Sequence, residues 1–187
     1  MLIYNRQTET WSGIGGPGFF FPQAVQTIYS ISVNTVNGTK LLAFSGGFTF
    51  TDGGYNFYNY AVWNFNESAW YFVPVIIEYY LFDIILLETG NMYIGGVMQI
   101  GVTRFYVLSV DIATGAYHTP GTLPAVIEEI GVFGLLVHND KNGNTYLYAA
   151  GLFEVDSPNT VPQSTTVGLI YTNVNGNEPW TVEFTLW

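Results

Sequence analysis

The chain has 187 residues, 49% hydrophobic and 10% charged, with four Lys and Arg against 14 Asp and Glu and a formal net charge of −10. A chain of this length can bury a sizeable core. Four cations cannot supply the basic stripe that nucleic acid requires, so we expect no nucleic-acid partner. The absence of Cys rules out a disulfide framework and a thiolate metal site.

The most apolar segment and the N-terminus do not resemble targeting or membrane segments. Residues 70–87 read WYFVPVIIEYYLFDIILL and are interrupted by Pro74, Glu78 and Asp83. Each charge at the middle of a bilayer would cost about 3 kcal/mol, so we expect strands here and no membrane span. The first residues, MLIYNRQTETW, contain no basic region followed by an apolar core, and no signal peptide is visible.

Taken in chain order, the sequence predicts a hairpin and three repeated units of four antiparallel strands, named a to d, with no helix. The first 15 residues supply strands c and d only. The strands expected in the three units lie near 26–33, 40–49, 58–64 and 69–73; near 82–89, 91–99, 105–112 and 116–119; and near 132–138, 145–154, 165–172 and 179–185.

Strand b contains a recurring motif, which reads LAFSGGFT from Leu42, MYIGGVMQ from Met92 and LYAAGLFE from Leu147. An apolar run ends in two small residues, so that Gly46, Gly96 and Gly151 are equivalent. Each motif follows a turn that contains glycine, which is typical of a hairpin. We interpret the small residues as packing devices that let the neighbouring sheet approach closely; a ligand approaching the glycine backbone is the alternative.

Strands c and d also recur. Leu2 to Asn5, Ala61 to Asn64, Leu108 to Asp111 and Leu169 to Thr172 align as strand c, and aromatic residues follow at short, similar distances. The intervals between these aromatics are in the range of a four-stranded propeller blade. We expect them to fill the space between sheets as it widens outward. They are Trp11, Trp70, Tyr117 and Trp180.

These segments resemble kelch-like and delta-60-type propeller repeats, which run LYVGGxFT, a glycine-containing loop, NxIAxW(D/N), a short turn and W. The matching segments are LAFSGGFTFTDGG with YAVWNFNESAW, MYIGGVMQ with VLSVDIATGAY, and LYAAGLFE with GLIYTNVNGNEPW. The second unit departs most, because it lacks the glycine-rich loop and has Val110 at the aromatic position. The resemblance implies a β-propeller or partial propeller. It says little about function, since such repeats occur in cell-surface proteins, cortical markers, oxidases and virion proteins of large DNA viruses.

The expected organisation is a hairpin at 1–15 and blades at 16–74, 75–121 and 122–187, together one repeat domain. Three blades do not close a ring, and an open array leaves its terminal faces bare. A homodimer, a longer chain or a larger assembly could cover them. An aromatic fraction of 18% favours burial against protein partners.

Little in the sequence points to catalysis. His118 and His138 are the only histidines, and a zinc site would need carboxylates from distant loops. The oxidases that share the repeat use a copper site with Cys, which is missing here. Neighbouring Glu128 and Glu129 would face opposite ways on a strand. The loop from Asp140 to Asn144 is better interpreted as a hairpin turn than as a calcium loop. We therefore expect no enzyme, no cofactor and no metal.

Two aromatic groups are candidates for binding: Tyr55, Phe57, Tyr58 and Tyr60 near the loop between strands b and c of the first unit, and Phe19, Phe20 and Phe21 after GIGGPG. Such rings can pack between blades, anchor a protein interface or stack on sugars.

The expected function is a non-enzymatic structural and protein-interaction propeller module. It would be a subunit of a larger assembly, either a virion (as a minor capsid or surface protein) or an extracellular cell-surface layer. The alternative is a glycan-binding propeller that uses the exposed loop aromatics.

Overall fold

The computed structural model describes residues 2–13, 27–52, 54–121, 127–155, 165–175 and 178–183. Within these ranges the fold is all-β and contains no helix. It consists of a two-stranded hairpin and three four-stranded antiparallel sheets. The expected all-β class and the four antiparallel strands of each unit are confirmed.

The strands of each sheet pair in chain order, so the first and last strands form the edges. The hairpin contains β1 (Leu2–Asn5) and β2 (Thr10–Gly13). Sheet 1 contains β3 (Thr27–Val36), β4 (Thr39–Asp52), β5 (Tyr55–Asn64) and β6 (Ala69–Tyr71). Sheet 2 contains β7 (Glu78–Leu86), β8 (Asn91–Ile100), β9 (Thr103–Asp111) and β10 (Tyr117–His118). Sheet 3 contains β11 (Ile127–Asn139), β12 (Thr145–Val155), β13 (Thr165–Asn173) and β14 (Thr181–Glu183).

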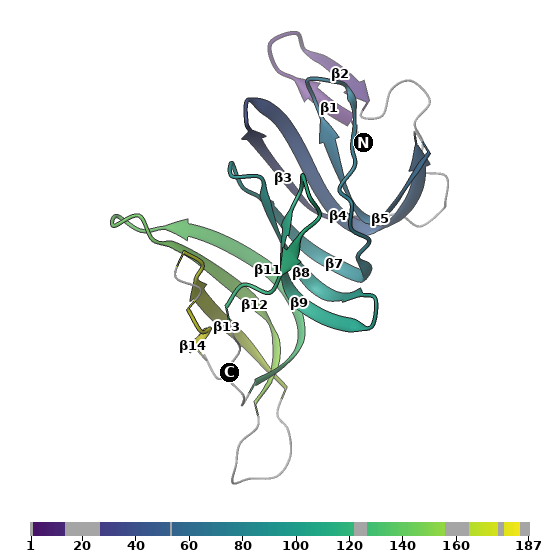
Figure 1. Ribbon diagram of the computed structural model, residues 1–187. Helices are drawn as coiled ribbons and strands as arrows, with labels where there is room; N and C mark the ends of the chain where they lie inside the picture. The colour runs from purple at the N-terminus through teal and green to yellow at the C-terminus, as the bar shows by residue number, and fades with distance from the viewer. Residues whose placement is uncertain are drawn as a thin grey trace.

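The three sheets stack face to face in chain order, with their first strands next to one another (Figure 1). One hydrophobic core joins sheets 1 and 2, where Ala43 and Val62 meet Ile94 and Leu108. A second core joins sheets 2 and 3. A third, aromatic cluster lies on the face of sheet 1 that points away from sheet 2. The described residues form an open stack, and no closed ring is present among them.

The hairpin turns match their sequences. Asn37 and Gly38, between β3 and β4, have φ angles of 48° and 79°. A tight two-residue turn that suits the twist of a hairpin needs positive φ at both positions, which Asn and Gly adopt readily.

The repeat glycines make room inside their own sheet rather than for the neighbouring sheet. A Cβ on Gly46, Gly96 or Gly151 would lie 1.9, 2.1 or 2.2 Å from a backbone oxygen of the first strand. The first strand has a β-bulge at each of these points, which pushes its carbonyl toward the glycine. Our expectation holds instead for Gly95, whose Cβ would meet Val132 of sheet 3 at 2.8 Å.

The turn after strand c is closed by a repeated side chain. The Oδ1 atoms of Asn64, Asp111 and Asn173 accept hydrogen bonds from backbone N–H groups two residues on, at 2.9, 3.0 and 3.1 Å. The sequence alignment placed Thr172 at this position, which is wrong by one residue. Thr172 pairs with Leu147 one step earlier in the ladder.

The apolar segment 70–87 forms the end of β6, a linker and β7, as expected from its interrupting Pro and charges. Among the described residues, no helix is long and apolar enough to cross a membrane.

Candidate functional site

The loop aromatics of the first unit divide between core and surface. Phe57 and Tyr60 are buried, whereas Tyr55 and Tyr58 are 49% and 36% exposed. Phe57 joins the aromatic cluster of sheet 1, and Tyr60 joins the core between sheets 1 and 2. Only two of the four rings are therefore available to a partner. The candidates Phe19, Phe20 and Phe21 lie outside the described residues.

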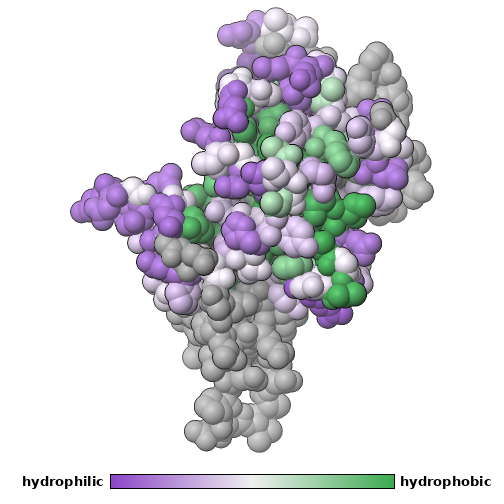
Figure 2. Space-filling view, in the orientation of Figure 1, coloured by the Kyte–Doolittle hydropathy of each residue, from purple (hydrophilic) through white to green (hydrophobic). Residues whose placement is uncertain are grey.

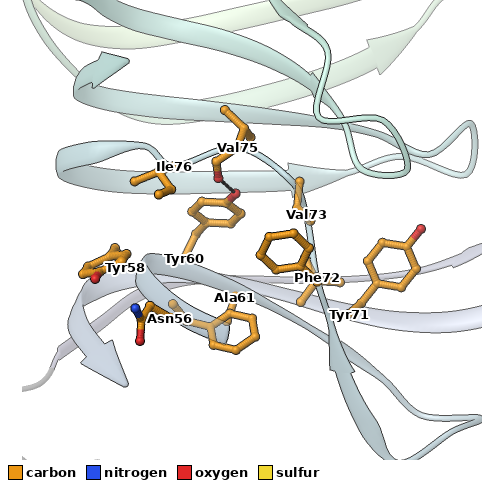
Figure 3. Close-up of a pocket in the computed structure, with 11 residues that line it drawn as sticks. Asn56, Tyr58, Tyr60, Ala61, Tyr71, Phe72, Val73, Val75 and Ile76 are labelled. Carbon is orange, nitrogen blue, oxygen red and sulfur yellow. Dashed lines mark hydrogen bonds between the residues drawn. The ribbon is translucent and has the colours of Figure 1, made fainter. Parts of the chain in front are cut away.

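Tyr60 connects β5 to the linker between β6 and β7 by a hydrogen bond. Its hydroxyl donates a hydrogen bond to the Val75 carbonyl oxygen at 2.5 Å (Figure 3). Burial raises the pKa of Tyr60 well above its ordinary value of 10.0, so the phenol stays protonated and keeps donating. The adjoining cavity of about 20 Å³ is large enough for little more than one water molecule.

A larger hollow of about 270 Å³ lies beside this small cavity. Its lining residues are Tyr58, Asn59, Ile76, Glu78 and Tyr79. Tyr58 and Ile76 line both spaces and lie near each other in Figure 3. The hollow combines two tyrosine rings, one aliphatic side chain, one amide and one carboxylate, and no cation.

Two residues of the hollow have unusual backbone angles. Asn59 has a φ of 61° and lies in β5 opposite three residues of β4, where the pairing of the two strands is interrupted, and Tyr79 in β7 has a φ of 75°. Asn tolerates this region, but for a bulky residue it costs about 1–3 kcal/mol. Such strain tends to occur at functional sites, and here it coincides with an exposed ring. The sequence contains no signal for it.

The aromatic surface continues beyond the hollow. Tyr55 stacks on Phe72 with ring centroids 4.3 Å apart, and Phe72 is itself 44% exposed. Phe72 lines the small cavity together with Tyr58 and Ile76. Sequence analysis missed Phe72, Ile76 and Tyr79, because they are distant from the loop in sequence.

Asp83 is a junction between all three sheets. One carboxylate oxygen accepts hydrogen bonds from the Ser30 hydroxyl of β3 and the Ile84 N–H. The other accepts the Leu135 N–H of β11 at 2.7 Å. Ser32 makes a similar contact from β3, since its Oγ accepts the Leu86 N–H at 2.9 Å. Side chains of one sheet thus satisfy backbone groups on the edge strand of the next.

A row of rings crosses the first strands at their bulges. Tyr29, Phe82 and Phe133 are the extra residues at these bulges. Their centroids are 5.7 Å apart from Tyr29 to Phe82 and 5.0 Å from Phe82 to Phe133. Tyr29 and Phe133, the ends of the row, are 46% and 49% exposed.

The repeat aromatics differ in burial. Trp180 is buried between sheets 2 and 3, and its Nε1 donates to the Pro120 carbonyl oxygen at 2.6 Å. Tyr117 is 43% exposed, and its ring centroid lies 5.8 Å from that of Phe105, which packs on the core between sheets 1 and 2, so Tyr117 fills this space only in part. Trp70 packs against the aromatic cluster on the outer face of sheet 1. Trp11 lies on β2.

In sheets 1 and 2, the face that points toward the following sheet is buried, whereas the equivalent face of sheet 3 is exposed. Tyr60, Val107 and Leu169 are equivalent, because each pairs with the residue before a repeat glycine. Tyr60 and Val107 are 6% and 1% exposed, but Leu169 is 36% exposed. Leu136 on the same face is 60% exposed and pairs with the half-buried Tyr148. We call this surface the open face of sheet 3.

The surface carboxylates of two turns are used for structure. Asp140 accepts the N–H groups of Asn142 and Asn144 and the Asn144 side-chain amide. These bonds, above all that from the Asn144 side chain, lower the pKa of Asp140. Asp111 is held in the same way by Thr114, which lowers its pKa. Within the described ranges, no group of three or more His, Asp or Glu could hold a metal ion.

Comparison of the chain with protein-family models, with curated protein sequences and with solved structures gives no match. The likeness of the repeats to kelch-like units stays a prediction. Support for a function comes from the geometry of the chain itself.

Proposed function

We propose that the chain is a non-enzymatic, propeller-type structural and protein-interaction module that functions as a subunit of a larger assembly. The observation that supports this most directly is the open face of sheet 3. At equivalent positions, Tyr60 and Val107 are covered by the following sheet, whereas Leu169 is exposed. Because the open face of sheet 3 is equivalent to the buried faces of sheets 1 and 2, it is suited to packing against a further sheet.

The row of rings at the bulges supports the same proposal. It ends on Phe133, whose ring is half exposed, next to the open face. A fourth sheet could continue the row as Phe82 continues it from Tyr29. The sheet could come from a second copy of this chain or from another protein.

The surface composition also favours association. Hydrophobic side chains reach the surface in patches over the middle of the molecule, beside hydrophilic ones (Figure 2). Exposed apolar patches of this kind mark interaction sites on soluble proteins. The polar groups that could serve chemistry, such as Asp83 and Asp111, are instead engaged with backbone N–H groups. A virion shell or a cell-surface layer, where repeats of the resembled kind occur, is the setting that we propose.

The proposal is tested by the native mass of the purified chain, by light scattering and native mass spectrometry. We expect a discrete oligomer, and Leu136→Lys should weaken association by about tenfold or more, because it places an unpaired charge in an apolar contact. Val102→Lys is the matched control, since Val102 is 96% exposed in the turn between β8 and β9. A monodisperse monomer at low micromolar concentration overturns the proposal. So does an oligomer that Val102→Lys disrupts and Leu136→Lys does not.

A further inference from the structure

The hollow between β5 and the start of β7 has the features of a built site. Two elements far apart in sequence meet there, and each contributes a residue with positive φ, Asn59 from β5 and Tyr79 from β7. The residues next to the lining are held in place: the Tyr60 hydroxyl donates a hydrogen bond to the Val75 carbonyl oxygen, and Ile77 is fully buried. The rings of Tyr58 and Tyr79 are nevertheless 36% and 51% exposed.

The lining restricts the chemistry of a ligand. Among the described lining residues there is no Lys, Arg or His, and Glu78 adds a negative charge to a chain with a formal net charge of −10. An anionic ligand is therefore disfavoured. A purely apolar ligand would cover the Glu78 carboxylate and the Asn59 amide without satisfying them. A ligand that fits has apolar faces and neutral hydroxyl edges.

We propose that this hollow binds a neutral sugar ring. The rings of Tyr58 and Tyr79, with Ile76, provide the apolar contact, and Asn59 and Glu78 hydrogen-bond the hydroxyl groups. The volume of about 270 Å³ is close to the roughly 300 Å³ at the lower end of ligand sites.

The neighbouring aromatic surface extends the site. Phe72, stacked on Tyr55, lines the cavity that shares Tyr58 and Ile76 with the hollow. A short oligosaccharide should therefore bind more tightly than a monosaccharide. The site is formed by sheet 1 and the start of β7, away from the open face of sheet 3, and it does not depend on the assembly proposed above.

The test uses the purified full chain and a fixed panel of probes. The neutral probes are maltotriose, cellotriose, mannotriose, chitotriose and lactose, and sialyllactose is the anionic probe. Binding is measured by saturation-transfer NMR and by fluorescence titration. We expect at least one neutral probe to bind with a Kd of about 1 mM or tighter.

Three variants separate binding from folding. Tyr58→Ala should weaken binding by about tenfold, because it removes one stacking surface. Tyr79→Gly should abolish binding but raise the unfolding temperature, because glycine adopts a φ of 75° without strain. Tyr80→Ala is the matched control, since Tyr80 follows Tyr79 in sequence and is 59% exposed but does not line the hollow. Its binding should be unchanged.

Several results would overturn the site. These are no binding of any neutral probe at about 10 mM, preferential binding of sialyllactose, or binding that Tyr58→Ala and Tyr79→Gly leave intact. A loss of binding in Tyr80→Ala equal to that in Tyr58→Ala would also reject it, because the contact would then lie elsewhere.

Discussion

The substitution Gly96→Ala tests the packing of the repeat most directly. The added Cβ would lie 2.1 Å from the Tyr80 carbonyl oxygen and 3.1 Å from the Leu81 Cα. Ordinary contact begins near 3.4 Å, so β7 and β8 would have to separate by about 1.3 Å at this point. Both obstacles are backbone atoms, which cannot rotate away as the end of a side chain can.

The loss of stability expected for Gly96→Ala follows from the position of β7 in the fold. Overpacking alone costs about 1–3 kcal/mol, and each ladder hydrogen bond that is stretched or lost adds about 1 kcal/mol. Displacement of β7 also disturbs Asp83, which contacts sheets 1 and 3. We therefore expect a loss of about 3 kcal/mol or more, which lowers the Tm by roughly 6–12 °C for a chain of this size.

The assay is urea and thermal unfolding, followed by tryptophan fluorescence and circular dichroism. Gly134→Ala is the matched control, because Gly134 is also in a sheet but its Cβ would meet no atom within 4 Å. Its stability should stay within about 0.5 kcal/mol of the wild type. Wild-type stability of Gly96→Ala, or an equal loss in Gly134→Ala, would refute the role assigned to the bulge.

Three further predictions concern polar groups. Asp83→Ala should lower the free energy of unfolding by about 2 kcal/mol or more, since it leaves the Ser30 hydroxyl and the Leu135 N–H without their charged acceptor; urea unfolding that matches the wild type would contradict this. Ser45→Ala should be neutral or stabilising by up to about 1 kcal/mol, because the buried Ser45 hydroxyl has no hydrogen-bond partner within the described ranges, and a clear loss of stability would reveal a missed partner. The hydrogen bonds that lower the folded-state pKa of Asp140 below 3.8 stabilise the fold above that pH, and this stabilisation is lost as the pH falls through the lowered pKa. The Tm advantage of the wild type over Asp140→Ala should therefore shrink between about pH 5 and pH 2, and a constant difference would argue against it.

The sequence by itself determined which segments are strands and where the chain turns. Both signals are local: alternating apolar residues predict strands, and Asn37 with Gly38 predicts a tight turn. The expected strand order and the all-β class were therefore confirmed. The first strands were placed less well, at 82–89 and 132–138 against the observed 78–86 and 127–139. Their bulges interrupt the alternation on which the prediction depends.

Register and burial were decided by the tertiary structure. A strand shifted by one residue turns every side chain to the other face, so the sequence could not show that Asn173, and not Thr172, closes the turn in sheet 3. Phe57 and Tyr58 are adjacent aromatic residues, yet Phe57 is buried and Tyr58 is exposed, because only Phe57 faces the aromatic cluster.

The contacts that matter most join residues far apart in the chain. In the sequence Asp83 is a charged residue within an apolar run. Its hydrogen bonds to sheets 1 and 3 become visible only where β3, β7 and β11 lie next to one another. In the sequence Gly96 is one of several small residues. Only the bulge of the adjacent strand β7 leaves no space for a Cβ at this position. A local pattern can specify strands and turns, but which atoms those strands bring together depends on the pairing and stacking of the whole chain.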